Sequence, residues 1–381
     1  MWRKFVPKRT VFAALGVFAS ILVPTLLNGQ GCVAIRGFSS CTGTTGSQFS
    51  LMKGDLQFGA NYRYFKSFRH FRGAHEEKHR IAEGTEVINR SSLLDLSISL
   101  GLSERIYASL TLPFVIHSRS SMYEHGGNPP GGLGERHSTR SHGLADLRIA
   151  TGYWLRDPAQ HFKSNYGLAL GIKFPTGNFK FVDQFYNQGE NRNEIRETVV
   201  DQSIQPGDGG TGFTLEGQSF HALSDHLLLS SNLYYLINPQ ATNGVLTRSG
   251  NEEFSCPDQF ALRTGLNYYK SRYATYLGGR IEGVPATDII GSSRGYRRPG
   301  YVISVEPGVS YALNQVIFSL NMPIALYRNR TQSFSDKQRT AETGVYRHGD
   351  AAFANYLVNF NVSYRFNVHP HDMDITFPES L

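Results

Sequence analysis

Hydrophobic and polar residues alternate along most of the chain from residue 54 onward, and the last such segment shows the pattern most clearly. In NYLVNFNVSYRF, residues 355–366, the even-numbered residues are Tyr, Val or Phe, and most of the odd-numbered ones are Asn, Ser or Arg. Successive side chains of a β-strand point to opposite faces. The segment is therefore predicted to be a strand with one apolar wall and one hydrated wall.

The same alternation recurs in twelve segments of about 10–13 residues, which is long enough to cross a bilayer at a tilt. The predicted strands are 54–66, 91–102, 106–117, 143–155, 164–175, 212–223, 227–238, 258–270, 273–284, 300–311, 315–327 and 354–366. The strands of a soluble sandwich are shorter and are joined by evenly short turns. The pattern therefore favours a membrane protein.

The connections between these strands alternate in length. Short connections fall at 103–105, 156–163, 224–226, 271–272 and 312–314, and long polar ones at 67–90, 118–142, 176–211, 239–257, 285–299 and 328–353. Short turns on one side and long loops on the other are typical of outer-membrane barrels. We expect an all-β fold, a transmembrane antiparallel up-and-down β-barrel of about 12 strands. Its short turns are periplasmic, its long loops are extracellular and structureless, and it lies in the bacterial outer membrane.

The N-terminal residues resemble a secretory signal. Four basic residues within 3–9 precede an apolar run at 11–27, and small and polar residues follow at 28–31, where cleavage is expected. We predict a signal peptide at 1–30; an uncleaved anchor and lipidation at Cys32 are the alternatives. Residues 54–366 form the predicted barrel.

The segments that flank the barrel lack its alternation. Residues 31–53 are either a disordered leader or a plug in the lumen, and a disulfide between Cys32 and Cys41 in an oxidising compartment favours the plug. At the other end, Phe366 is the terminal aromatic residue that barrel-assembly machinery is expected to read. Residues 367–381 follow it as a predicted periplasmic tail.

Composition adds little to this picture. The hydrophobic fraction of 40% alone suits a soluble secreted protein, but 12% aromatic residues and 39 Gly also suit a membrane barrel. The net charge of +7 is spread along the chain, so we predict no nucleic-acid partner. The sequence contains no C-x-x-C-H haem motif, and we predict no cofactor.

Twelve charged residues fall on the polar side of the predicted strands. A charge that faced lipid would be costly, which supports this register. These residues either form salt bridges that brace the wall of a narrow lumen or line a pore whose charges select solutes. They are Asp55, Arg63, Asp95, Asp146, Arg148, Lys173, Glu216, Arg263, Arg280, Glu282, Glu306 and Arg365.

The sequence HEEKH at His75–His79 matches the H-E-x-x-H motif of zinc proteases, which requires both His on one face of a rigid helix. Here the motif lies in a predicted loop between Gly73 and Gly84, and no third ligand follows in the expected pattern. We predict no enzyme activity and no catalytic residues, and we keep His75 and His79 only as metal-contact candidates. A lipolytic barrel is disfavoured too, because Arg119 stands where a Ser two residues after His117 is needed.

Several segments, taken in order, resemble the outer-membrane barrels of the meta-pathway phenol-degradation type. They are GLADLRIATGYWL (143–155), LGIKFPTGN (170–178), SIQPGDGGTGFTLEGQSF (203–220), VEPGVSYAL (305–313) and LNMPIALY (320–327). The resemblance covers roughly residues 140–330 and is poor in the N-terminal third. It implies a small barrel that lets hydrophobic or aromatic compounds cross the outer membrane, and it implies no catalytic residues.

The sequence leaves three functions open. The first is a passive channel for small apolar or aromatic solutes, with outer-membrane lipid and the assembly machinery as its other partners. The second is a structural or surface-interaction barrel without transport. The third is metal-ion handling through the His-rich loops at 70–79 and 117–142.

Overall fold

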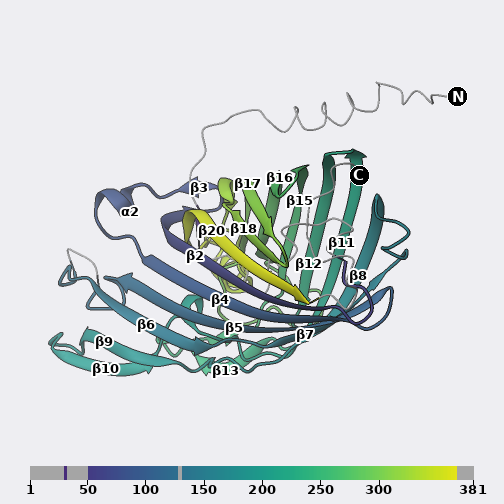
Figure 1. Ribbon diagram of the computed structural model, residues 1–381. Helices are drawn as coiled ribbons and strands as arrows, with labels where there is room; N and C mark the ends of the chain where they lie inside the picture. Colours follow the sequence, from purple (N-terminus) through teal and green to yellow (C-terminus); the bar gives the residue numbers. More distant parts are fainter. Residues whose placement is uncertain (1–29, 32–49, 128–130, 367–381) are drawn as a thin grey trace, which may run out of the picture.

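The computed structural model describes residues 30–31, 50–127 and 131–366. Its main sheet closes on itself as a twelve-stranded antiparallel β-barrel, as the alternation predicts (Figure 1). Two of the barrel strands are interrupted and carry two labels each. The barrel strands are β2 (Leu56–Arg72), β4 (Ile88–Gly101), β5 (Ile106–Ser121), β6 (His137–Leu144) with β7 (Arg148–Trp154), β8 (Ser164–Lys173), β11 (Gly212–Ser224), β12 (Leu227–Ile237), β15 (Gln259–Lys270), β16 (Tyr273–Val284), β17 (Gly300–Leu313), β18 (Val316–Asn321) with β19 (Ile324–Asn329), and β20 (Ala351–Phe366).

The first and last barrel strands close the barrel. β2 pairs antiparallel with β20, from Leu56 opposite Phe366 through Asn61 opposite Asn361 to Phe71 opposite Ala351. Near the first residues of β20, the two residues of β1 (Gln30–Gly31) also pair with that strand, opposite Ala354 and Phe353. The predicted register of the last strand is therefore correct, because Asn359 is buried and Phe360 points outward with 41% of its surface exposed.

The outer face of the barrel is an apolar belt. Leu94, Leu96, Ile98 and Leu100 follow one another on the outside of β4, each about 40% exposed, and Leu170 on β8 is 68% exposed. Water-exposed leucines in such number would be unfavourable, whereas hydrocarbon is a matching environment for them. In the described residues, no helix is long and apolar enough to span a membrane.

Two barrel strands are interrupted, and a proline explains one of the two breaks. β18 and β19 are separated by Met322 and Pro323, and a proline has no amide hydrogen to donate to a neighbouring strand. Beyond this break, β19 and β20 share a single residue pair, Ile324 with Tyr356. The segment 143–155, predicted as one strand, is divided at residues 145–147, which connect β6 to β7.

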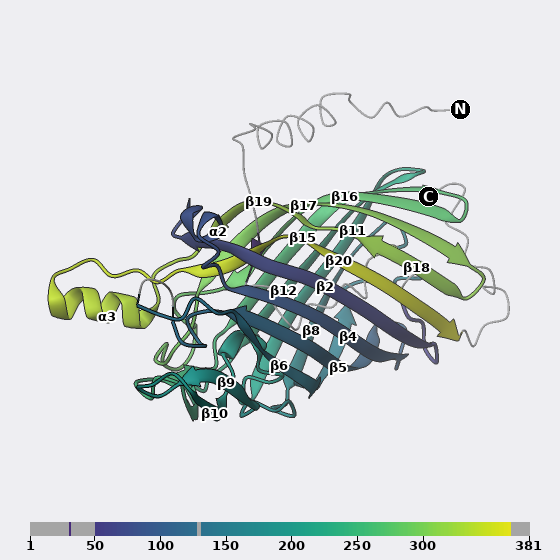
Figure 2. The same ribbon diagram turned by 90° about the vertical axis from the view of Figure 1, so that its left-hand side faces the viewer.

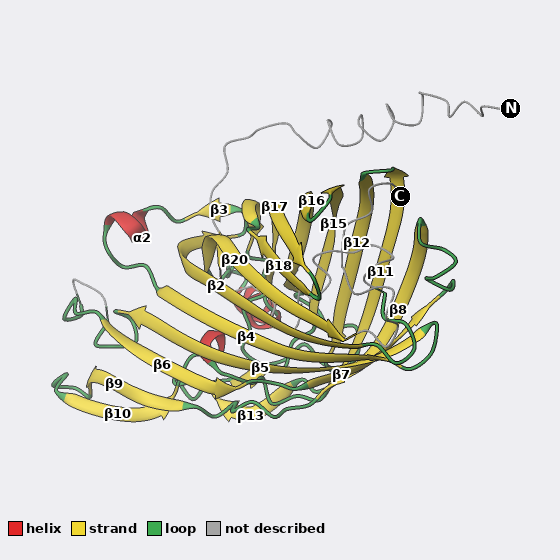
Figure 3. Ribbon diagram, in the orientation of Figure 1, coloured by secondary structure: helices red, strands yellow, loops and turns green. Residues whose placement is uncertain are grey.

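The long loops contain secondary structure, which corrects the expectation that they are structureless. The segment 67–90 contains β3 (His75–Glu76) and α2 (His79–Ala82), and 176–211 contains β9 (Val182–Gln188), β10 (Glu194–Val199) and the 3₁₀ turn η2 (Gln202–Ile204). β13 (Thr242–Leu246) pairs with β14 (Glu253–Ser255). Among the described residues, the helices are short and lie in the loops (Figure 3).

The helix α3 (Phe334–Thr343) projects from the long-loop end of the barrel (Figure 2). A capping box starts it: the Ser333 side chain accepts from the Asp336 amide, and the Asp336 side chain accepts from the Ser333 amide. Gly344, at φ 68°, ends it in the left-handed conformation that glycine adopts without strain. These local signals form a helix without a buried face.

Candidate functional site

The twelve charged residues predicted to line the lumen lie on or beside the inner face of the barrel, and ten of them form ion pairs with one another. The five pairs are Asp55–Arg365, Asp146–Lys173, Arg148–Glu216, Arg263–Glu306 and Arg280–Glu282. The other two contact amides: Arg63 Nε donates to Asn359 Oδ1 at 3.1 Å, and Asn61 Nδ2 donates to Asp95 Oδ2 at 3.4 Å.

The most deeply buried charges form a network on β15, β16 and β17. Arg263 and Arg280 lie directly opposite each other on neighbouring strands, a placement in which two cations repel. Arg263 Nε donates to Glu306 Oε1 at 2.9 Å, and Arg280 Nη2 donates to Glu282 Oε2 at 2.7 Å. The Arg263 guanidinium also lies 3.8 Å from the ring centroid of Tyr276. The two glutamates thus neutralise the two arginines away from bulk water.

The second group of charges fastens an inward-folded loop to the wall. Asp146, at the break between β6 and β7, accepts from the amides of Gly177 at 3.0 Å and Asp208 at 3.1 Å. Lys173 at the end of β8 pairs with both Asp146 and Asp208. Gly207 passes so close to Gly177 that a Cβ on Gly207 would lie 2.5 Å from the Gly177 carbonyl oxygen. Asp146, at the strand break, therefore holds this loop, whose residues Gly207 and Asp208 line the lumenal cavity.

A lumenal cavity lies beside these charges, with about 1500 Å³ of space between atoms, including space open to solvent. Its lining includes Phe65, Leu93 and Val115, which are buried on the inner faces of β2, β4 and β5. Tyr234 and Leu236 on β12 and Phe254 on β14 extend this apolar lining. Polar and charged residues such as Asp95, His117 and Lys173 line the same cavity, so its wall is mixed and not the uniformly hydrated wall that the sequence analysis expects.

These apolar lining residues are the part of the site that sequence reasoning missed. Phe65, Leu93 and Val115 each stand at an inward position of a predicted strand, in register with Arg63, Asp95 and the other polar residues of that face. Each is a single apolar residue in an inward row that is polar again beyond it toward the long-loop end, with Ser67 beyond Phe65, Ser91 beyond Leu93 and His117 beyond Val115. The alternation therefore gave no signal for them.

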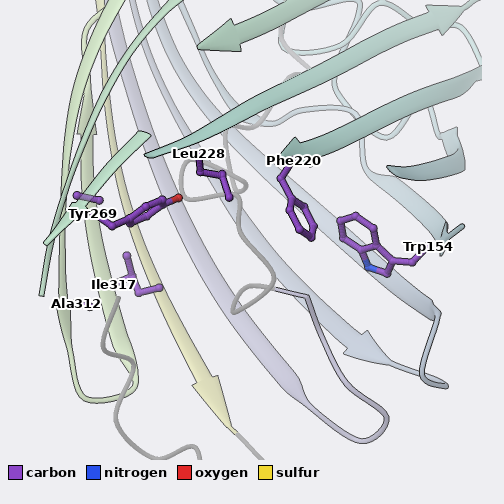
Figure 4. Close-up of a cluster of buried hydrophobic side chains, with 7 residues drawn as sticks. Trp154, Phe220, Leu228, Tyr269, Ala312 and Ile317 are labelled. Atoms are coloured by element: carbon purple, nitrogen blue, oxygen red, sulfur yellow. The ribbon is translucent and has the colours of Figure 1, made fainter. Parts of the chain in front are cut away.

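A second apolar cluster lines the barrel at its short-turn end. Its buried members come from seven strands, and the rings of Trp154 and Phe220 meet edge to face at 5.8 Å (Figure 4). The cluster consists of Trp154, Phe220, Leu228, Tyr269, Ala274, Ala312 and Ile317. The inner surface of the barrel is therefore apolar at its short-turn end.

Above the cavity, ion pairs join the long loops. Burial alone would raise the pKa of Asp201, but the charges of Arg119 and Arg298 hold that pKa well below its usual range. Burial would likewise raise the pKa of Asp350, but its hydrogen bond to His70 and the neighbouring positive charges hold it well below its usual range. These carboxylates stay ionised at neutral pH and tie the loops across the barrel mouth.

The His75 and His79 candidates do not form the helical arrangement of a zinc protease. His75 lies in β3 and His79 begins the four-residue helix α2, so the two side chains do not share a helix face. Within the described ranges, no group of three or more His, Cys, Asp or Glu residues is arranged to hold a metal ion. His117 points into the lumen and its Nδ1 lies 2.9 Å from Ser91 Oγ.

Four predictions rest wholly or mostly on residues outside the described ranges: the signal peptide at 1–30, the lumen plug at 31–53, the disulfide between Cys32 and Cys41, and the tail at 367–381. Cys256, the third cysteine, is buried with a free thiol.

Comparison with known proteins supports the barrel fold. No protein-family model matches the sequence, and no curated protein sequence matches it. The structure is similar to that of an outer membrane channel from Pseudomonas putida F1, at a TM-score of 0.56 and 11% identity, over 83% of this chain and 97% of that one. A weaker likeness is to the translocator domain of the autotransporter NalP from Neisseria meningitidis, at a TM-score of 0.42 and 11% identity, over 94% of this chain and 98% of that one. Another is to the toluene transporter TodX of P. putida, at a TM-score of 0.40 and 10% identity, over 91% of this chain and 100% of that one. The fold and the apolar outer belt together assign the chain to the β-barrels of the bacterial outer membrane.

Proposed function

We propose that the protein is a passive outer-membrane channel for small hydrophobic or aromatic solutes. The observation that carries this proposal is the set of large apolar side chains in the lining of the lumenal cavity, to which Phe65, Leu93, Val115 and Leu236 contribute beside charges that are paired. A channel for sugars or ions needs a hydrated inner surface, because its solutes keep their hydrogen bonds only with water or polar groups. An apolar solute instead gains free energy by leaving water for such a surface.

The charges of the lumen are assigned a bracing role in this proposal. Ten of the twelve pair with one another, and Arg280 and Glu306 are at most 2% exposed. Paired and buried charges are poor selectors of a passing ion, since their fields largely cancel. They fix the shape of the wall and leave the apolar side chains of the cavity lining for the solute.

Two resemblances support this function. The segments between 143 and 327 resemble barrels of the meta-pathway phenol-degradation type, which implies aromatic solutes. The fold is similar to that of a solved outer membrane channel. We propose membership of the phenol-degradation type on the sequence segments alone.

The function is tested by uptake into cells. A bacterial host that lacks the gene receives wild-type protein, a Leu236→Asp variant or an Asn232→Asp variant, and the initial uptake of a radiolabelled monoaromatic hydrocarbon is measured. Both variants add the same charge to the inner face of β12, but Leu236 lines the cavity and Asn232 does not. We expect wild type and Asn232→Asp to raise uptake several-fold over empty vector, and Leu236→Asp to lose most of that gain.

Proteoliposome swelling in a pentose sugar measures whether the barrel instead admits a hydrophilic solute. Rapid swelling, together with hydrocarbon uptake equal to empty vector, would contradict the proposal and favour a hydrophilic pore. Slow swelling with hydrocarbon uptake equal to empty vector would favour a barrel whose role is structural.

A further inference from the structure

A row of basic side chains crosses the outer face of four neighbouring strands at the long-loop end of the barrel. Lys66 on β2 lies opposite Arg90 on β4, Arg90 lies opposite Ser118 on β5, and Ser118 lies opposite Arg140 on β6. The strands lie side by side in this order (Figure 1, Figure 2). We call Lys66, Arg90 and Arg140 the basic row.

The basic row faces outward. The residues beside each member in sequence are buried on the lumenal face: Phe65 and Ser67 flank Lys66, and Asn89 and Ser91 flank Arg90. Arg90 and Arg140 are exposed, and Lys66 is half-buried with its Nζ 4.8 Å from the Phe68 ring centroid. Because alternate side chains of a strand point to opposite faces, these cations lie on the membrane side of the wall.

The row lies next to the apolar belt. One step toward the short turns, the outward positions of the same strands are Tyr64, Ser92, Ile116 and His142; two steps away they are Tyr62, Leu94, Phe114 and Leu144. From the long-loop end toward the short turns, the outward side chains are thus first cationic, then mixed, then apolar. A membrane changes in the same order from its phosphate-bearing headgroups through the interface to the hydrocarbon.

The protein does not neutralise this row. No member forms an ion pair within the part of the chain that the structure describes, and the nearby Asp183 carboxylate accepts from the backbone amide of Arg140 at 2.6 Å. Lys66 and Arg90 stand directly opposite each other, which is unfavourable for like charges on neighbouring strands. An external anion would relieve that repulsion.

The arrangement is confined to one side of the barrel. At the long-loop ends of other strands, the outward positions are aromatic, with Phe213 on β11, Tyr235 on β12 and Tyr301 on β17. A general attraction to an anionic membrane surface would not require the basic side chains to be gathered on one side of the barrel. In addition, a row at right angles to tilted strands runs obliquely to the membrane plane, so its cations meet the headgroup layer at successive depths.

We propose that the basic row binds a phosphorylated glycolipid of the outer leaflet, with Lys66, Arg90 and Arg140 contacting its phosphate groups. A glycolipid that carries several phosphates at different depths matches an oblique row better than a lipid with one phosphodiester. Arg and Lys at a membrane surface are attracted to such anionic groups. The site is independent of the lumen and therefore of the proposed transport function.

The test uses native mass spectrometry of the purified full chain in detergent, titrated with bisphosphorylated lipid A and with the same glycolipid after its phosphates are removed. The variant Lys66→Gln/Arg90→Gln/Arg140→Gln removes the row. The matched control Arg294→Gln/Lys337→Gln/Arg347→Gln removes three positive charges at exposed loop residues. We expect wild type and control to bind the phosphorylated lipid at least tenfold more tightly than the dephosphorylated one, and the row variant to lose this preference.

Equal affinity of the row variant and the control for bisphosphorylated lipid A would overturn the proposal, and so would equal affinity of wild type for the two lipids. Competition with millimolar inorganic phosphate distinguishes a glycolipid site from a site for free anions. Displacement of the lipid by phosphate would contradict a glycolipid site. Heat-modified mobility on gels verifies folding. If the triple variant does not fold, Arg90→Gln and Arg90→Lys are compared, and only the Lys variant is expected to keep tenfold selectivity.

Discussion

Arg263 on β15 donates a 2.9 Å hydrogen bond across the intervening strand to Glu306 on β17. Arg263 is 2% exposed and Glu306 is 0% exposed. Arg280, on the strand between them, lies opposite Arg263 and has its Nη1 4.0 Å from Glu306 Oε2. Glu306 is thus the carboxylate that two buried arginines share, and the wall of the barrel at this level depends on it.

Glu306→Gln should destabilise the barrel by roughly 3 kcal/mol, because removing one partner of a buried ion pair leaves the other charge uncompensated. Urea titration of folding into lipid vesicles measures this free energy. Glu104→Gln, at an exposed position in a short turn, removes the same charge and should change stability by less than about 0.5 kcal/mol. Equal effects of the two substitutions would mean that Glu306 does not neutralise the arginines.

Phe360→Arg should cost roughly 2–4 kcal/mol of folding free energy, because Phe360 faces lipid between Leu320 and Tyr62 on the neighbouring strands. Asn361→Arg, one residue further along β20, faces the lumen and should cost far less. Folding of both variants into bilayers gives the two values. A larger penalty at Asn361 would mean that the register of β20 is reversed.

Asp146→Ala should release the inward-folded loop at 205–210. The substitution removes the acceptor of the Gly177 and Asp208 amides and one carboxylate partner of Lys173. Single-channel recording should show a larger ion conductance than wild type, and protease should cut the loop faster. Asp225→Ala, in an exposed short turn, is the control and should leave both unchanged. Unchanged conductance in Asp146→Ala would show that the loop is held without this carboxylate.

His125 should make the loop packing near β9 sensitive to acid. Burial, with His137 and Arg248 nearby, lowers the pKa of His125 to about 4, below the ordinary value of 6.5. Its Nδ1 accepts from the Tyr186 amide at 3.1 Å, and protonation would remove that acceptor. The folded loop therefore binds a proton less readily than the unfolded loop. The free energy that stabilises the folded loop is constant above pH 6.5 and decreases as the pH is lowered from 6.5 to 4.

Hydrogen exchange of the Tyr186 amide, corrected for the intrinsic rate at each pH, measures this effect. Wild type should lose protection as the pH falls through that window. His125→Phe keeps a ring against Phe185, which stacks on His125 at 5.5 Å, and should show weaker protection that no longer depends on pH. The same pH dependence in His125→Phe would assign the titration to another group.

Much of the barrel could be predicted from the sequence, because alternation is a direct consequence of a wall that separates lipid from lumen. The strand predicted at 273–284 coincides with β16, and that at 106–117 lies within β5. The inward position of Arg263 and Arg280 follows from the same alternation, since neither cation tolerates hydrocarbon.

The cavity and the loops could not be predicted in the same way. Phe65 and Leu93 are apolar whichever way they point, so residue type does not reveal that they line the lumen. Asp208 contacts Asp146 and Lys173, which lie 62 and 35 positions away in the sequence. These contacts depend on a strand break, and no local sequence pattern specifies them. By contrast, α3 was missed although its capping box at Ser333 and Asp336 is local, because the long loops were treated as structureless.

The location of a bound solute tests the central claim most directly. Crystals of the protein soaked with 4-bromophenol, and diffraction recorded at the bromine absorption edge, would show where an aromatic solute binds. The predicted result is an anomalous bromine peak inside the barrel, within contact distance of Phe65, Leu93, Val115 or Leu236. Bromine peaks confined to the outer apolar belt, with none in the lumen at saturating solute, would contradict the claim that this surface receives the solute.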